Sequence, residues 1–186
     1  MAQKGQLQFL KVKALKNSDK ALNPKDLEAL ALRYVSRYAT TKHKLKSYLH
    51  RKVREKGGEE DHVSVIIKIA EKYEQLGYID DALFAEHRAS SLLRRGYGER
   101  RIEQALKQAG IDKPNQVKAL KLSEKGKWDA AEKFAQKRRI GPYASEQYDR
   151  AKCQKMLQAF MRAGHGYEIA AKFVFAKPGE MVEQNF

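Results

Sequence analysis

Apolar residues recur three and four positions apart over most of this chain, and glycines interrupt the pattern at intervals. Between residues 24 and 38, one face of a helix would carry Leu27, Leu30, Ala31, Tyr34, Val35 and Tyr38. No stretch alternates apolar and polar residues as a half-buried strand does, and no strand–helix–strand rhythm is present. The pattern therefore predicts an all-α protein.

The apolar segments group into three tandem three-helix units, which we expect at residues 23–77, 78–125 and 126–177. Repeated units of this kind contact mainly their neighbours, so the expected molecule is elongated and curved. Two segments fall outside the units. Residues 1–22 are predicted to be a basic, partly disordered N-terminal arm, and residues 178–186 a C-terminal tail.

The stretch from Leu76 to Ile111 combines helix ends with basic residues. Gly77 is suited to a left-handed helix cap, and Gly96 and Gly98 bracket a second tight turn. Asp80 and Asp81 directly precede an apolar-periodic helix that carries Phe84, a position where aspartate binds free amides. The same two aspartates are also open to interpretation as a carboxylate pair for acid–base chemistry or magnesium binding, but capping is the favoured interpretation.

Positive charge is in large excess, since 38 Lys and Arg outnumber 23 Asp and Glu and leave a formal charge of +15. Nucleic acid is the leading partner for such a protein, because each neutralised phosphate releases condensed counterions. A ribosome, an anionic membrane surface or a merely solvated basic face are the alternatives. The outer faces carry Lys and Arg rather than Asn and Gln, which favours phosphate contact over base reading.

The basic residues form three clusters, one in each predicted unit. On the predicted helix 42–54, His43, His50 and Arg54 are expected opposite the apolar stripe. The candidate partner-binding and DNA-binding residues are Lys46, Arg51 and Arg54 in the first unit, Arg88, Arg94, Arg95, Tyr97, Arg100 and Arg101 in the second, and Lys137, Arg138 and Arg139 in the third.

Two further features of the turn at 96–98 suggest binding. Backbone amides at the start of the helix that follows are expected to help bind an anion. Tyr97, and Tyr143 in the third unit, are candidates for stacking on single-stranded bases, with packing across the bundle as the alternative.

Catalytic and metal-binding motifs are missing from the sequence. Cys153 is the one cysteine and is expected to be buried in a helix, and the five histidines lack metal-ligand spacing. We therefore expect no enzyme activity, no cofactor and no metal. Without an apolar run of roughly 20 residues or a secretory signal, the expected protein is cytoplasmic and has no membrane partner. We expect it to be a monomer.

The residues YIDDALFA at 78–85 and LLRRGYGERRI at 92–102 resemble the signature of the RecX family of recombinase regulators. The similarity extends from about residue 24 to 177, through ALRYVSRYATTKHKLKSYLHRKV at 31–53, RRIGPY at 138–143 and MLQAFMRAGHGYEIA at 156–170. It implies three tandem three-helix bundles. It also implies a regulator that binds RecA, commonly in the groove of the RecA–DNA filament, and modulates, usually inhibits, strand exchange and ATP hydrolysis.

Two positions depart from the pattern of that family. Thr41 is followed three residues later by Lys44 instead of glutamate, so the reciprocal helix cap is lost. His165 stands where the family usually has phenylalanine, which predicts looser or pH-sensitive packing.

Two other functions stay open at this point. One is an autonomous nucleic-acid-binding module without a recombinase partner, and the other is a helical-repeat enzyme that uses Asp80 and Asp81.

Overall fold

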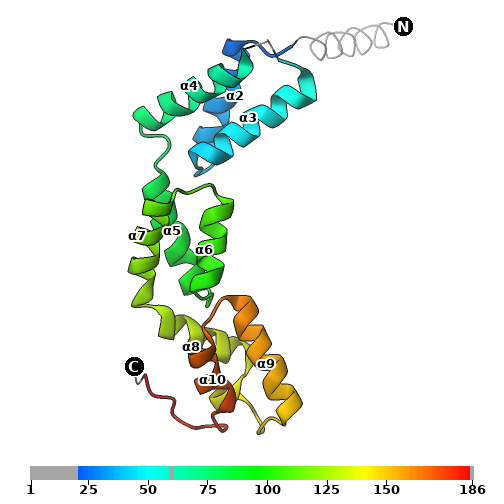
Figure 1. The fold of residues 1–186 in the computed structure, drawn as a ribbon, viewed down its shortest axis with the longest axis vertical. Helices are drawn as coiled ribbons and strands as arrows, with labels where there is room; N and C mark the ends of the chain where they lie inside the picture. The colour runs from blue at the N-terminus through cyan, green and yellow to red at the C-terminus, as the bar shows by residue number, and fades with distance from the viewer. Residues whose placement is uncertain (1–20, 59–60, 185–186) are drawn as a thin grey trace, which may run out of the picture. The chain divides into compact units, whose positions relative to one another are not determined.

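The computed structural model describes residues 21–58 and 61–184. Within these ranges the chain forms nine α-helices, one short 3-10 helix and no strand, which confirms the all-α prediction (Figure 1). Most of the predicted N-terminal arm lies outside the described residues. Its last residue, Leu22, was wrongly assigned to the arm, because its side chain is buried in the first core and its amide donates to the carbonyl of Gly57.

The fold divides into two compact units at the boundary between Asp80 and Asp81, and each is described by itself. Three separate hydrophobic cores are present, one in residues 22–79 and two in residues 81–186. The division into three units with a boundary near residue 125 stays a prediction.

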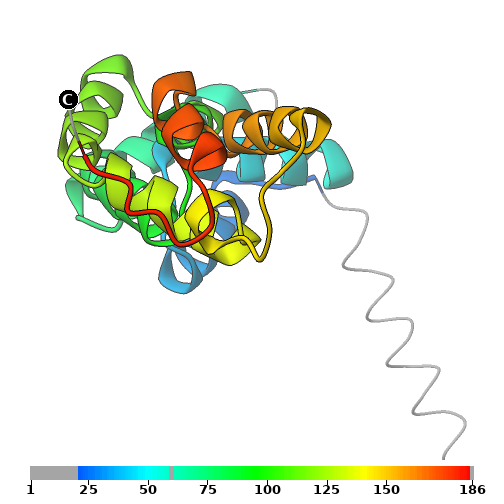
Figure 2. The same cartoon turned by 90° about the horizontal axis from the view of Figure 1, so that it is seen from below.

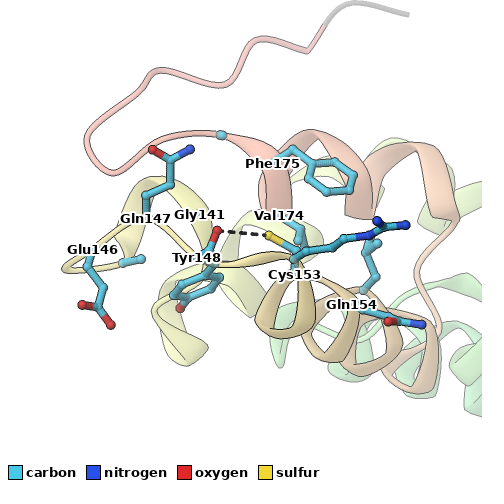
Figure 3. Close-up of a pocket in the computed structure, with 12 residues that line it drawn as sticks. Gly141, Glu146, Gln147, Tyr148, Cys153, Gln154, Val174 and Phe175 are labelled. Atoms are coloured by element: carbon cyan, nitrogen blue, oxygen red, sulfur yellow. Dashed lines mark hydrogen bonds between the residues drawn. The ribbon is translucent and has the colours of Figure 1, made fainter.

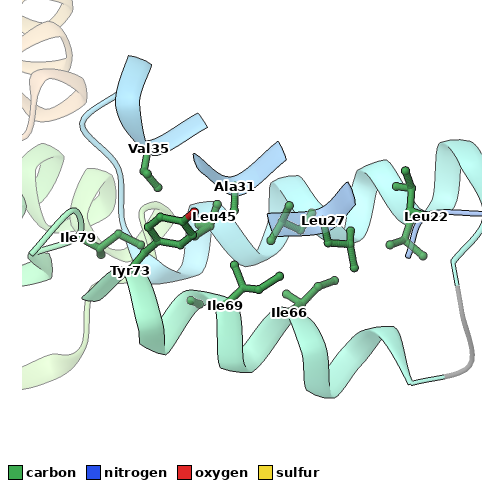
Figure 4. Packing of buried hydrophobic residues seen from close by; sticks show 12 residues of the cluster. Leu22, Leu27, Ala31, Val35, Leu45, Ile66, Ile69, Tyr73 and Ile79 are labelled. Atoms are coloured by element: carbon green, nitrogen blue, oxygen red, sulfur yellow. The ribbon is translucent and has the colours of Figure 1, made fainter. Parts of the chain in front are cut away.

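The first unit consists of α2 (Pro24–Arg37), α3 (Lys42–Lys56) and α4 (His62–Gln75). Asn23 begins α2 with a complete capping box, in which Asn23 and Asp26 exchange side-chain and backbone hydrogen bonds. The N-terminal cap of α3 is Thr41, one of the two adjacent threonines at which this helix was expected to begin, and its hydroxyl accepts from the amide of Lys44. Figure 4 shows how Leu27 and Ala31 of α2 meet Leu45 of α3 and Ile66 of α4 in the core.

The second compact unit contains α5 (Asp81–Arg94), α6 (Glu99–Gln108) and α7 (Lys113–Glu124), followed by α8 (Lys127–Arg138), η1 (Gly141–Tyr143), α9 (Arg150–Ala163) and α10 (Tyr167–Phe175). Small residues allow close packing, since Ala85 and Ala89 of α5 are buried against Ile102 and Leu106 of α6. Trp128, Phe160 and Phe173 form the aromatic centre of the second core in this unit. Beyond α10 the chain turns back past η1, where the amide of Gly179 donates to the carbonyl of Pro142 (Figure 2).

Helices α4, α5, α6 and α9 end in the same hydrogen-bonded turn. At the end of α4 the amide of Tyr78 donates to the carbonyl of Tyr73 and the amide of Gly77 donates to that of Glu74, with Gly77 at φ +75°. These bonds bind the last carbonyls of the helix and require a left-handed residue, which glycine adopts without strain. The predicted caps at Gly77 and Gly96 are thereby confirmed.

Candidate functional site

Two glycine-containing turns pack against each other within residues 81–186. The amide of Gly98, between α5 and α6, donates to the carbonyl of Ala163 at 2.9 Å, and the amide of Arg100 donates to that of Gly164 at 3.1 Å. A Cβ atom on Gly98 would lie 2.4 Å from the backbone of Gly164. Only glycine permits this approach, so the turn at 96–98 is held directly on the turn at 164–166.

His165 lies buried between these turns, with 3% of its surface exposed. Its Nε2 atom is 3.1 Å from the carbonyl oxygen of Gly96, and its ring contacts those of Phe134 and Phe160 at centroid distances of 5.5 and 5.3 Å. Burial lowers the pKa of His165, and the hydrogen bond with Gly96 opposes that shift. The expectation of looser packing at this position is wrong, because the imidazole fills its site and binds a backbone carbonyl.

The basic residues of the predicted second and third units meet around the same turns. The ammonium group of Lys137 on α8 donates to the carbonyl of Arg95 at the end of α5, at 2.9 Å. The basic residues at the ends of α5 and α8 and at the start of α6, together with Arg88, are all exposed. None of them forms an ion pair with a carboxylate within the described residues. We name this set the turn cluster: Arg88, Arg94, Arg95, Arg100, Arg101, Lys137, Arg138 and Arg139.

The position of the turn-cluster residues on their helices separates two explanations for their charge. Arg94 and Lys137 lie in the last turns of α5 and α8, where a cation stabilises the helix dipole. Arg100 and Arg101 lie in the first turn of α6, where a cation opposes the dipole. The helix dipole therefore explains the first pair but not the second, and Arg101 of the second pair donates to Gln104 Oε1 at 3.0 Å within α6.

Two of the amides at the start of α6, where an anion was expected to bind, already donate to protein carbonyls. The amide of Arg100 donates to the carbonyl of Gly164, and the amide of Arg101 donates to that of Gly98. Because these two amides already donate to protein carbonyls, an anion near the start of α6 would be bound by the guanidinium groups of Arg100 and Arg101 instead.

Tyr97 and Tyr143 are packing residues more than stacking platforms. Tyr97 is half-buried against the core of α5 to α7, as is Phe84, and the Arg95 guanidinium lies 5.6 Å from its ring centroid. The hydroxyl of Tyr143 donates to Glu132 Oε1 at 2.7 Å. The structure thus favours the alternative of packing across the bundle for both rings.

The two aspartates of the sequence signature lie where α5 begins. Asp80 is exposed just before the helix, and Asp81 is its first residue. Within the described residues, no group of three or more His, Cys, Asp or Glu is arranged to hold a metal ion.

In the first unit the predicted stripe of α3 is buried, through Leu45, Leu49 and Val53. Of the candidates, Arg51 and Arg54 are exposed and Lys46 is half-buried, and Arg51 pairs with Glu55 at 3.7 Å.

The placement of His50 on the outer face of α3 is wrong. Its ring lies edge-on to that of His62 on α4, at a centroid distance of 6.3 Å. Burial lowers the pKa of His50, and the nearby positive charges of His62, Arg54 and Lys46 add to this effect.

Two surface residues were not among the sequence candidates. Arg162 is exposed in the last turn of α9, one residue before Ala163, whose carbonyl binds Gly98. The placement of Tyr38 on the apolar face of its helix is wrong, because α2 ends at Arg37 and Tyr38, which follows it in an extended conformation, exposes 52% of its surface. Arg162 could have been identified from the sequence, because the same spacing of Arg and Gly occurs before both turns. No sequence pattern distinguishes the exposed Tyr38 from the tyrosines that pack in the core.

Cys153 lines a cavity of about 460 Å³ between the 144–148 loop, α9 and the end of α10 (Figure 3). Its thiol points to the carbonyl of Tyr148 at 3.8 Å, and its side chain is half-buried rather than buried as expected. Leu157, Val174 and Phe175 contribute the apolar part of the lining. No helix in the described part of the chain is long and apolar enough to cross a membrane.

Comparison with known sequences gives similar proteins along most of the chain. A family model described as "RecX, second three-helix domain" matches residues 80–120. The regulatory protein RecX of Myxococcus xanthus is 33% identical over 167 residues, which cover 84% of this chain and 88% of that protein. The regulatory protein RecX of Pectobacterium atrosepticum is 39% identical over 82 residues, or 44% of this chain and 50% of that protein.

Solved structures give similar folds. The crystal structure of RecX from Lactobacillus salivarius aligns with a TM-score of 0.59 and 26% identity, over 79% of this chain and 91% of that one. A second crystal structure, of regulatory protein RecX, aligns with a TM-score of 0.60 and 25% identity, over 78% of this chain and 70% of that one.

Proposed function

Because this chain belongs to the RecX family of regulatory proteins, we propose that it binds RecA in the groove of the RecA–DNA filament. There it modulates, and usually inhibits, strand exchange and ATP hydrolysis. The protein acts by occupying a surface and not by catalysis, in line with relatives that are named as regulatory proteins.

The observation that carries this proposal is the concentration, in the turn cluster, of exposed cations without a carboxylate partner in the described part of the chain. Carboxylates pair with exposed lysines elsewhere in the same compact unit, as Glu103 does with Lys113 and Glu86 with Lys118. In the turn cluster no such pairing occurs within the described residues. Cations that lack carboxylate partners contribute little to folding, but they speed docking onto an acidic protein surface or a phosphate backbone.

The arrangement of the turn cluster suits a rigid contact surface. Arg95, Arg100 and Arg101 flank the 96–98 turn, whose backbone is hydrogen-bonded to the turn after α9, so the backbone that carries these three residues is fixed before a partner arrives. A preorganised surface loses less conformational entropy on binding than a mobile one. The cations of α3 provide a second contact in the first unit, through Lys46, Arg51 and Arg54.

The test is the ATPase activity of RecA on single-stranded DNA, measured over a wide concentration range of the purified protein. We expect ATP turnover to fall as the protein is added. A variant with Arg94, Arg95, Arg100 and Arg101 all changed to Glu should require at least about tenfold more protein for the same effect, because each reversed charge repels the same partner. An unchanged ATPase rate at all concentrations would overturn the proposal.

The matched control reverses four exposed lysines outside the turn cluster: Lys68, Lys107, Lys121 and Lys155. It changes the net charge by the same amount, so it should weaken the effect much less if position matters. If both variants lose the same activity, the contact depends on net charge alone. Salt-dependent DNA binding with no effect on RecA would instead support an autonomous nucleic-acid-binding module.

A further inference from the structure

Three tyrosine rings form a row where α2 packs on α3. The rings of Tyr34 and Tyr48 stack with centroids 4.4 Å apart and planes 14° apart. The ring of Tyr38 lies on the other side, 5.4 Å from that of Tyr34 and tilted by 53° to it. The row therefore runs from α3 across α2, with Tyr38 at its outer end.

Core packing explains two of these rings but not the third. Tyr34 and Tyr48 are half-buried and pack against the core of the first unit. Tyr38 exposes 52% of its surface and is not among the residues that pack against this core, so its ring is open to a ligand.

The position of Tyr38 is fixed before any ligand binds. It forms the C-terminal cap of α2, and its amide donates to the carbonyl of Tyr34 at 3.0 Å. Its ring also contacts the ring of Tyr34. A flat group placed against the exposed side of Tyr38 would meet a platform that loses little freedom on binding.

Cations flank both ends of the row. The guanidinium group of Arg51 lies 5.6 Å from the ring centroid of Tyr48, and the ammonium group of Lys52 lies 6.0 Å from it. Arg37, next to Tyr38 in sequence, is exposed. Glu55 pairs with both Arg51 and Lys52 and offsets part of this charge, so the rings and not the cations must provide selectivity.

We propose that the row Tyr38–Tyr34–Tyr48 is a binding site for single-stranded nucleic acid. One base stacks on the open side of Tyr38, and the neighbouring phosphates lie near Arg37 and Arg51. Stacking fits any base, because each has an aromatic face. A duplex fits poorly, because its bases are already stacked on each other. An acidic protein surface would use the cations but would have no need of the exposed ring.

This site goes beyond filament regulation, since it needs no recombinase. The test uses the full chain and two labelled oligonucleotides of equal length, one of thymidines and one without bases, and follows fluorescence anisotropy at fixed salt. The wild-type chain should bind the thymidine strand more tightly than the abasic one. Tyr38→Ala should lower the affinity for the thymidine strand by at least about fivefold and leave the affinity for the abasic strand unchanged.

Two variants separate the ring from general effects. Tyr38→Phe keeps the ring and should bind thymidines as the wild type does. Tyr167→Ala removes a tyrosine of similar exposure, 58%, at the start of α10 and should also bind normally.

The proposal fails if the abasic strand binds as tightly as the thymidine strand, or if Tyr38→Ala binds both as the wild type does. It also fails if Tyr38→Ala weakens duplex and single-stranded DNA equally, which would indicate phosphate contact alone. The Tyr38→Ala variant also separates the two proposals in the RecA ATPase assay. If the effect on RecA comes from contact with the filament, this variant should still lower ATP turnover, whereas competition for the single-stranded DNA would be weakened by it.

Discussion

The Nε2 atom of His165 lies 3.1 Å from the carbonyl oxygen of Gly96, so a buried imidazole joins the turn after α5 to the turn after α9. These residues are 69 positions apart in the chain. Their contact adjoins the backbone that carries Arg95, Arg100 and Arg101, so the protonation state of one histidine bears on the turn from which these three arginines extend.

His165 should make the stability of residues 81–186 depend on pH. Burial lowers its pKa in the folded chain below the unfolded value of about 6.5. The neutral form is therefore favoured by folding, and this stabilisation is present above the unfolded pKa and is lost as the pH falls through the folded pKa. We expect His165→Phe to lose about 1 kcal/mol at pH 7.5, because the hydrogen bond to Gly96 is removed, and less at pH 5.

Urea denaturation of both proteins at pH 7.5 and pH 5 measures this difference. The comparison between variants cancels the contribution of His50, whose pKa is also lowered. An equal stability difference at both pH values would show that His165 does not titrate in this way.

The contact between Gly98 and Gly164 predicts a large cost for one methyl group. In Gly98→Ala the new Cβ would lie 2.4 Å from the backbone of Gly164, where no flexible side chain is able to move aside. We expect a loss of about 2 to 3 kcal/mol in the free energy of unfolding. Gly166→Ala is the control, because nothing lies within 4 Å of its Cβ position. Equal thermal stability of the two variants would contradict the close approach of the turns.

Arg139 is the one non-glycine residue with a positive φ in the described chain, at φ 53° and ψ 52°. It occupies the left-handed position after α8, where the amides of Arg139 and Ile140 bind the carbonyls of Gln136 and Ala135. Arg139→Gly should raise the free energy of unfolding by up to about 1 kcal/mol, since glycine adopts this conformation without strain.

Arg138→Gly is the control for Arg139→Gly. Arg138 is the last helical residue of α8, so this change should lower stability by a few tenths to about 1 kcal/mol. A stabilised Arg139→Gly that is also a weaker inhibitor of RecA would indicate that this arginine is kept for binding. Lower stability of Arg139→Gly in chemical denaturation would instead indicate that its side chain supports the fold.

Lys137 is expected to contribute to the fold more than the neighbouring cations do. Its ammonium group donates to the carbonyl of Arg95 and so joins the start of the α8–η1 connection to the end of α5. Lys137→Met keeps the aliphatic stem and removes the donor, and should cost about 0.5 kcal/mol because the bond is exposed to water. Lys133→Met, on the same helix, should leave the melting temperature nearly unchanged. The same melting temperature for both variants would place Lys137 among the purely surface cations.

Helix positions and ends follow from short-range chemistry, and the sequence was sufficient to predict them. Thr41 begins α3 and Gly77 and Gly96 end α4 and α5, because caps and left-handed turns involve residues within a few positions of each other. The apolar face of each helix could also be predicted from the sequence, as the burial of Leu45, Leu49 and Val53 on α3 demonstrates.

The errors occurred where distant helices meet. His50 faces α4 rather than solvent, and the amides at the start of α6 bind the carbonyls of a turn more than sixty residues away. Helical periodicity predicts neither contact. It gives the direction in which a side chain leaves its own helix, but not which other helix or turn it will contact.

Local propensity, capping and apolar spacing were thus sufficient to predict the helices and their turns from the sequence. The excess of basic residues follows from the composition. The tertiary structure decided which turns touch, which cations find no carboxylate within the described residues, and which tyrosine stays open at the end of a row. The physical reason is range: hydrogen bonds that form a turn act over three to five residues, whereas packing brings Gly98 beside Gly164 only after the helices between them have folded together.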